Sequence, residues 1–83
     1  MSRKRLYRRL NAGAVRNVSF TDFVNLIEGF GFYLHHVRGS HHIFRHPLFP
    51  RRLNLQDNQG QAKPYQIRQF LDLVERYNLK LEE

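Results

Sequence analysis

The chain has 83 residues, of which 41% are hydrophobic and 13% aromatic, and it contains no cysteine. This length predicts one small domain with a thin core, the apolar fraction argues against wholesale disorder, and the lack of cysteine excludes disulfides and thiolate metal sites. No apolar stretch approaches the roughly 20 residues of a membrane span, and the first 15 residues lack the apolar segment of a secretory signal. We therefore expect no membrane association and a cytoplasmic location.

The charge of the chain is strongly positive and unevenly placed. Lysine and arginine number 14 against 7 aspartate and glutamate residues, which gives a net charge of +7. Residues 1–21 are basic without any acid, and there is no acid between Gly29 and Gln56. A polyanion such as RNA, DNA or an acidic protein is the expected partner. For the N-terminal segment, the alternative is a solvated, disordered basic arm.

We predict a basic N-terminal arm over residues 1–18 and a main domain over residues 19–83. Within the arm, a short helix over "RKRLYRRL" would be interrupted by "NAGAVRN", and the sequence leaves open whether the arm is ordered.

The main domain is predicted to begin with a helix in "SFTDFVNLIEGFG". Ser19 can cap this helix, with Asp22 as the acid of a capping box. Gly29 and Gly31 end it. Its core face is marked by apolar residues at helical spacing, namely Phe20, Phe23, Val24, Ile27 and Phe30.

Three strands are predicted next. In "FYLHHVR", Phe32 and Leu34 alternate with Tyr33 and His35, as in a half-buried strand. Gly39 and Ser40 form a tight turn, and "HHIFRH" runs back as the second strand. The segment "PLFPR" is predicted as a loop bounded by its two prolines. The third strand covers residues 52–56, with its two leucines inward.

A final helix is predicted from Pro64, which suits a first helical turn, to Asn78. One face of it carries Ile67, Phe70, Leu71, Val74 and Tyr77. The order α-β-β-β-α predicts an α+β fold, in which two helices cover one face of a three-stranded antiparallel sheet. The other face of the sheet would remain open to solvent.

All five histidines of the chain lie between residues 35 and 46. Adjacent strand residues point to opposite faces, so neighbouring histidines in one strand cannot share a role. If Phe44 faces the core, then His42 and His46 lie on that side near its margins. The outward residues of the same strand are then His41, Ile43 and Arg45.

A metal site is disfavoured by this arrangement. His42 and His46 would lie about 13 Å apart along a strand, too far for one ion at about 2.1 Å per bond. A cross-strand pair of His36 with His42 would still lack a carboxylate or thiolate to complete the ligand set. We predict no metal and no cofactor.

A histidine beside a glycine turn in an acid-free basic field suits a nuclease better. Arginines would hold the phosphate, and a neutral imidazole would take a proton from the RNA 2′-hydroxyl, which then attacks its own phosphate. Imidazole exchanges protons near neutral pH, and nearby cations favour its neutral form.

The stretch "GFGFYLHHVRGSHHIFRHP" resembles the signature of HicA-type (YcfA-like) toxins, and the later "LNLQ" and "GQAKPYQIRQFLDLVERYNL" resemble the family's third strand and final helix. The resemblance implies a double-stranded-RNA-binding-domain-like fold. It also implies an mRNA interferase, a ribonuclease of a type II toxin–antitoxin pair that a HicB-type antitoxin neutralises. The family's catalytic histidine corresponds to His41. Where many members carry Pro-His after the third strand, this chain has Gln56-Asp57.

With His41 as the base, phosphate contacts are expected from Arg38, Ser40 and Arg45, and further RNA contacts from Lys63 and Arg68 near the last helix. Two alternatives stay open within the same fold. One is an RNA-binding module without catalysis, and the other is a protein whose basic surface only docks the antitoxin.

Overall fold

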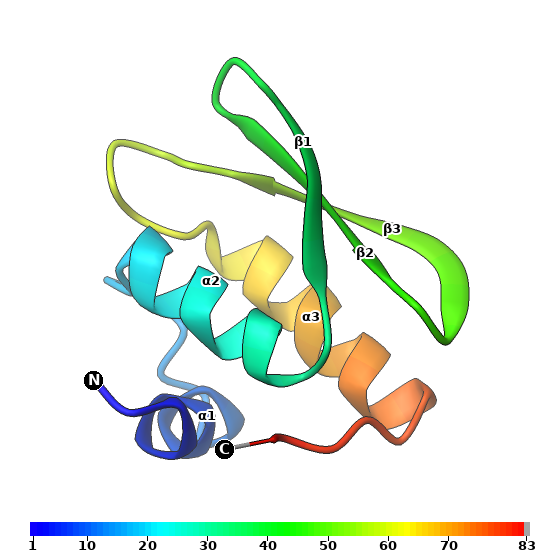
Figure 1. Ribbon diagram of the computed structural model, residues 1–83. Coiled ribbons are helices and arrows are strands. Elements are labelled where there is room, and N and C mark those ends of the chain that lie inside the picture. The colour runs from blue at the N-terminus through cyan, green and yellow to red at the C-terminus, as the bar shows by residue number, and fades with distance from the viewer. Residues whose placement is uncertain (83) are drawn as a thin grey trace.

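The computed structural model describes residues 1–82. Its elements are, in chain order, α1 (Arg3–Asn11), α2 (Phe20–Gly29), β1 (Tyr33–Arg38), β2 (His41–His46), β3 (Phe49–Gln56) and α3 (Pro64–Arg76). Figure 1 shows the sheet as one layer, α2 and α3 as a second layer against one of its faces, and α1 beyond α2. The predicted α+β class and the α-β-β-β-α order of the main domain are confirmed.

Helix α2 starts and stops where its capping residues predict. The hydroxyl of Ser19 accepts a hydrogen bond from the Asp22 amide at 3.3 Å, which satisfies one of the free N–H groups of the first turn. The helix is closed by Gly31, whose φ of +98° is a left-handed conformation that favours glycine. The core face differs from the predicted one at two positions, because Leu26 is fully buried and Val24 only partly.

The basic N-terminal segment contains a helix that packs on the domain. Ser2 caps α1 by accepting from the Arg5 amide, and Leu6 and Leu10 are buried in the same core cluster as the main domain. The Arg3 guanidinium donates to the backbone of α2 at 2.8 Å. The boundary at residue 18 between arm and domain remains a prediction, but residues 3–11 are an ordered helix.

The three strands pair in the order β1-β2-β3, all antiparallel. The turn between β1 and β2 is Gly39-Ser40, with Gly39 at φ +60°. The β1–β2 hairpin extends past the helices (Figure 1), so the edge strand β1 is exposed along its whole length. The expectation of a half-buried first strand was therefore wrong for Leu34, which is 46% exposed although it pairs with the core residue Phe44.

Strand β3 begins earlier than predicted. The segment 47–51 was expected to be a loop because of its prolines, but the strand already starts at Phe49, after a turn at residues 47–48. Pro50 is tolerated because β3 is an edge strand, where a residue without an N–H group need not break a ladder. Phe49 is buried against the end of α3, where its ring stacks on Tyr77 with the centroids 4.2 Å apart.

The core lies between the sheet and the helices and is rich in phenylalanine. Phe23, Phe44 and Phe70 come from α2, β2 and α3 and are almost completely buried. The rings of Phe23 and Phe70 meet edge to face at 5.4 Å, a favoured aromatic geometry. This packing fixes β2 against the helices and thereby decides which of its side chains point away from them.

Candidate functional site on the open face of the sheet

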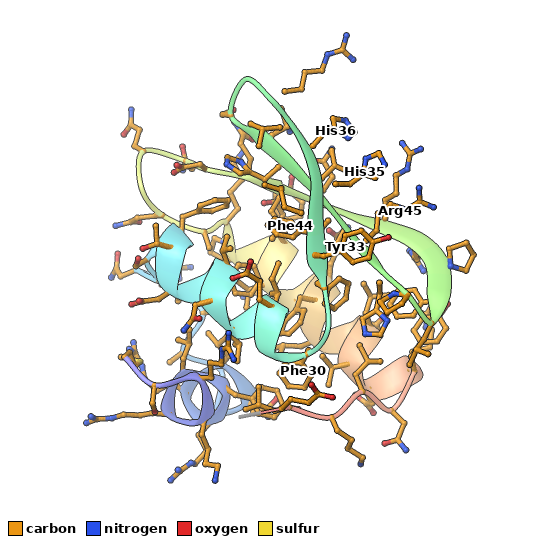
Figure 2. All side chains as sticks on the ribbon, viewed as in Figure 1. Phe30, Tyr33, His35, His36, Phe44 and Arg45 are labelled. Atoms are coloured by element: carbon orange, nitrogen blue, oxygen red, sulfur yellow. The ribbon has the colours of Figure 1, made fainter. Side chains whose placement is uncertain are left out.

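The outer face of the sheet, away from the helices, carries a cluster of basic and histidine side chains. Residues directly opposite one another in paired strands share a face, and the pairing places on this side Tyr33 with Arg45, His36 with Ile43 and Asn54, and Arg38 with His41 and Gln56. Figure 2 shows His35, His36 and Arg45 pointing away from the helical layer, whereas Phe44 points toward it. We call this side the open face.

The open face contains no carboxylate from the strands, because residues 29–56 contain no aspartate or glutamate. Its positive side chains, from Arg38, Arg45 and Arg52, therefore lack a neutralising acid within the sheet itself. A surface of this kind attracts phosphate groups. The structure thus collects on one side the charges that the sequence showed only as an acid-free stretch.

His41 is the first residue of β2 and is exposed on the open face. Its Nδ1 lies 3.2 Å from the side-chain oxygen of Asn54 on β3. When the Nδ1–H donates to that oxygen, the free lone pair of the imidazole is on Nε2, which is the arrangement of a general base held in one tautomer. The amide of Asn54 thus orients the ring as a second residue does in many catalytic pairs.

Three of the residues expected to contact phosphate lie on the open face or in the turn beside it. Arg38 is its cross-strand partner on β1, Ser40 precedes it in the turn, and Arg45 lies four residues further along the same face of β2. The backbone oxygen of Ser40 accepts from the Asp57 amide at 2.9 Å, which ties the turn to the end of β3. Backbone pairing between β1 and β2 therefore fixes the positions of His41 and Arg38 relative to each other.

Lys63 and Arg68 belong to the helical layer. Lys63 is the N-cap residue of α3 and makes no side-chain capping bond. Arg68 is exposed and lines a groove between α1 and α3 together with Tyr7, Asn11 and Leu71. The residues that line this groove do not include His41. RNA contacts from Arg68 would need a second surface.

The inner histidines of β2 point where the sequence predicted. His42 is half-buried and packs against Phe20, with the ring centroids 4.9 Å apart. His46 is only 7% exposed and has both ring nitrogens occupied. Its Nε2–H donates to the Phe30 carbonyl at 2.9 Å, and its Nδ1 accepts from the Leu48 amide at 3.1 Å. The first bond joins β2 to the end of α2, and the second fixes the turn after β2.

His35 and His36 form a close pair that the sequence reasoning missed. Their Nδ1 atoms lie 2.7 Å apart. The pKa of His35 is lowered from its ordinary value of 6.5, first by local removal from water and then by the positive charges of His36, Arg45 and Arg52. Strand alternation alone would have placed the two rings on opposite faces, so no pattern in the sequence predicts the pair.

Asn54 was also missed, although a signal for it exists. It lies between the inward residues Leu53 and Leu55, so alternation predicts that its amide points to the same side as His41. The register of β3 against β2, which brings it diagonal to His41, could not be predicted from either strand alone.

Within residues 1–82 there is no cluster of three or more histidine, aspartate or glutamate side chains that could hold a metal ion. No helix in that part of the chain is long and apolar enough to cross a membrane.

The fold and the basic, histidine-bearing open face define a small α+β protein suited to a polyanionic ligand. The family model described as "HicA toxin of bacterial toxin-antitoxin" matches residues 20–75, which span α2, the sheet and almost all of α3. The chain therefore belongs to the HicA toxin family, and this family implies an antitoxin partner. No curated protein and no solved structure gives a match.

Proposed function

We propose that this toxin is an endoribonuclease that cleaves mRNA, with His41 as the general base. The observation that carries the proposal is the pairing of an exposed imidazole with an orienting amide: His41 Nδ1 lies 3.2 Å from the Asn54 oxygen. This leaves Nε2 as a proton acceptor on a face whose charged strand residues are all basic. A toxin that acts on mRNA would work in the cytoplasm.

The chemistry follows from these positions. RNA would lie on the open face with its phosphates held by Arg38 and Arg45 at different points along β2, and with Ser40 in the turn beside His41. His41 Nε2 would take the proton of the adjacent 2′-hydroxyl, whose oxygen then bonds to phosphorus. The bond between phosphorus and the 5′-oxygen breaks, which gives a 2′,3′-cyclic phosphate and a new 5′-hydroxyl end. A positioned base of this kind contributes roughly 10²- to 10⁴-fold in rate.

The same face is the one that an antitoxin would block. We propose that a HicB-type antitoxin covers it with acidic or substrate-mimicking groups, because only such groups complement an acid-free basic surface. Replacing Arg45 by glutamine should weaken the complex between toxin and antitoxin. Co-expression of the antitoxin with the wild-type toxin should restore the growth of the cells. An interface confined to the helical layer would contradict this assignment.

A non-catalytic RNA-binding protein is the second candidate, and one observation favours it. The Asp57 carboxylate accepts from the Gly60 amide at 2.8 Å, and the Gln56 amide donates to Gln66 at 2.9 Å. Because neither Gln56 nor Asp57 is a histidine, the end of β3 supplies no second imidazole beside His41. Such a protein would bind RNA on the open face without cutting it.

The cleavage assay separates the two candidates. Purified protein is incubated with RNA in EDTA, and the ends of the products are analysed. We expect cleavage with cyclic phosphate and 5′-hydroxyl ends, and no cleavage when the nucleotide before the scissile bond is a 2′-deoxynucleotide. Binding without cleavage would favour the second candidate. Activity that disappears in EDTA and returns with a divalent metal would contradict the histidine-only mechanism.

A further inference from the structure

The paired imidazoles of His35 and His36 are a second chemical group on the open face. The β1–β2 register shifts between Leu34 and His36, and a bulge of this kind inserts an extra residue and re-aims its side chain. As a result, two consecutive residues bring their rings together, with Nδ1 atoms 2.7 Å apart and centroids 4.9 Å apart. Both rings are exposed, and Figure 2 shows them beside Arg45 on the side away from the helices.

A contact of 2.7 Å between two ring nitrogens requires one proton between them, because one nitrogen must donate and the other accept. The pKa of His35 is lowered first by local removal from water and then by three positive neighbours, His36 on β1, Arg45 on β2 and Arg52 on β3. In one of the two arrangements that this contact allows, the Nδ1–H of His36 donates to His35 Nδ1. The Nε2–H of a His36 imidazolium is then free to give a proton to a ligand.

His36 is a diagonal cross-strand neighbour of His41. His36 is paired with Ile43, two residues from His41 on the same face of β2. Such diagonal neighbours have Cα atoms about 7–8 Å apart, which long side chains can span. If the scissile phosphate lies between the two imidazoles, each ring nitrogen can come within roughly 2.6–3.2 Å of the RNA oxygen with which it exchanges a proton.

We propose that His36 is a second catalytic residue, which gives a proton to the 5′-oxygen of the RNA as the chain is cut, with His35 as the residue that positions it. The inference rests on the proposed ribonuclease function. As His41 takes the 2′-hydroxyl proton and the new bond to phosphorus forms, the bond to the 5′-oxygen breaks. The electron pair of that bond stays on the oxygen, which takes the Nε2 proton of His36. The two histidines exchange protons with solvent before the next cycle.

This assignment differs from a purely electrostatic role in a measurable way. A cation that only holds phosphate is needed whatever group leaves. A proton donor is needed only when the leaving group is a poor one. Sulfur in place of the bridging 5′-oxygen leaves as a thiolate, and thiols are far stronger acids than alcohols, with a pKa near 8.5 for cysteine. The thiolate therefore departs without a proton donor.

The test uses the full-length protein with two RNA substrates, one ordinary and one with a bridging 5′-sulfur. We expect His36→Ala to cleave ordinary RNA at least about 100-fold more slowly than the wild type, as for loss of a general acid. On the sulfur substrate, the same variant should come within about tenfold of the wild type. His41→Ala is the matched control, because loss of the base should slow both substrates alike.

Thermal unfolding of both variants, together with His36→Gln, shows whether the fold is intact, which we expect because both side chains are exposed. Unchanged cleavage of ordinary RNA by His36→Ala and His36→Gln, or equal losses on both substrates, would overturn the role of His36 while leaving the ribonuclease in place. A wild type that cleaves neither substrate, or a fully active His41→Ala, would overturn the proposed function itself and this inference with it.

Discussion

The two ends of β2 carry the same side chain in opposite surroundings. His41 begins the strand, points to the open face and is exposed, with one hydrogen bond to an amide oxygen. His46 ends the strand, points to the core and is 7% exposed, with both ring nitrogens bonded to backbone groups and its ring stacked on Phe49 at 4.8 Å.

This difference shows that residue type alone does not assign a role to a histidine. His46 has no nitrogen left for a ligand, so it can only stabilise the fold. His41 has one nitrogen directed to solvent and little packing to lose, so it can act on a ligand. Side chains of a strand alternate between its two faces. His41 and His46 are five positions apart, an odd number, so they point to opposite faces of the sheet.

The largest effect on stability is expected from His46→Ala. This substitution leaves the Phe30 carbonyl and the Leu48 amide without their partner and opens a cavity beside Phe32 and Phe49. We expect a loss of about 2–4 kcal/mol in the free energy of unfolding, measured by urea denaturation. The matched variant His41→Ala should lose no more than about 0.5 kcal/mol. Equal losses of unfolding free energy in the two variants would contradict a structural role for His46 and an exposed, weakly packed His41.

The contact between His46 and the turn after α2 can be tested through two glycines of matched conformation. Gly31 and Gly13 have φ values of +98° and +95°. A Cβ added to Gly31 would lie 2.7 Å from His46 Nε2, whereas nothing lies within 4 Å of one added to Gly13. Alanine at either position should cost about 1–3 kcal/mol of backbone strain. Gly31→Ala should cost at least about 1 kcal/mol more by denaturation, and equal costs would argue against the close packing.

A smaller effect is expected on the salt dependence of RNA binding. If Arg45 contacts a phosphate, Arg45→Gln should reduce the slope of log affinity against log salt by about 0.7 for single-stranded RNA. Arg76 is a matched control of equal charge, paired with Asp72 at 3.0 Å on α3, and Arg76→Gln should leave the slope unchanged. The slope is measured by fluorescence anisotropy over a series of salt concentrations. Equal slopes for Arg45→Gln and the wild type would remove Arg45 from the RNA surface.

The smallest effect concerns the pH dependence of stability. The pKa of His35 is lowered in the folded protein, so below about pH 6.5 the unfolded chain binds a proton that the folded chain does not. The wild type should therefore lose stability relative to His35→Gln as the pH falls below that value, and the two should run parallel above it. Thermal unfolding across this range measures the difference. A relative gain in wild-type stability at low pH would contradict a lowered pKa of His35 in the folded protein.

Much of this architecture could be predicted because local patterns and tertiary packing agree. Helix α2 has a cap at Ser19 and glycines at its end, and the inward positions of Phe44, Leu53 and Leu55 follow strict alternation. The inward positions of His42 and His46 followed from Phe44 in the same way. The early start of β3 could not be predicted, because Pro50 is compatible with either a loop or an edge strand, and only the strand order decides between them.

The site was predicted only in part, for a related reason. The face of His41 follows from one strand, but its bond to Asn54 depends on the register between two strands. The pairing of His35 with His36 depends on a bulge between β1 and β2, which no single-strand pattern reveals. Interactions within one element could be predicted from the sequence, whereas those between elements required the fold.

The most direct test of the central claim is to measure RNA cleavage and unfolding together for His41→Ala and His46→Ala, in EDTA and at a temperature where both variants are folded. We expect His41→Ala to lose roughly 10²- to 10⁴-fold in cleavage rate while its unfolding free energy stays within about 0.5 kcal/mol of the wild type. We expect His46→Ala to be clearly destabilised but, per folded molecule, to cleave RNA at a rate close to that of the wild type. Full cleavage by His41→Ala, or a loss in His46→Ala of the same size at full folding, would contradict it.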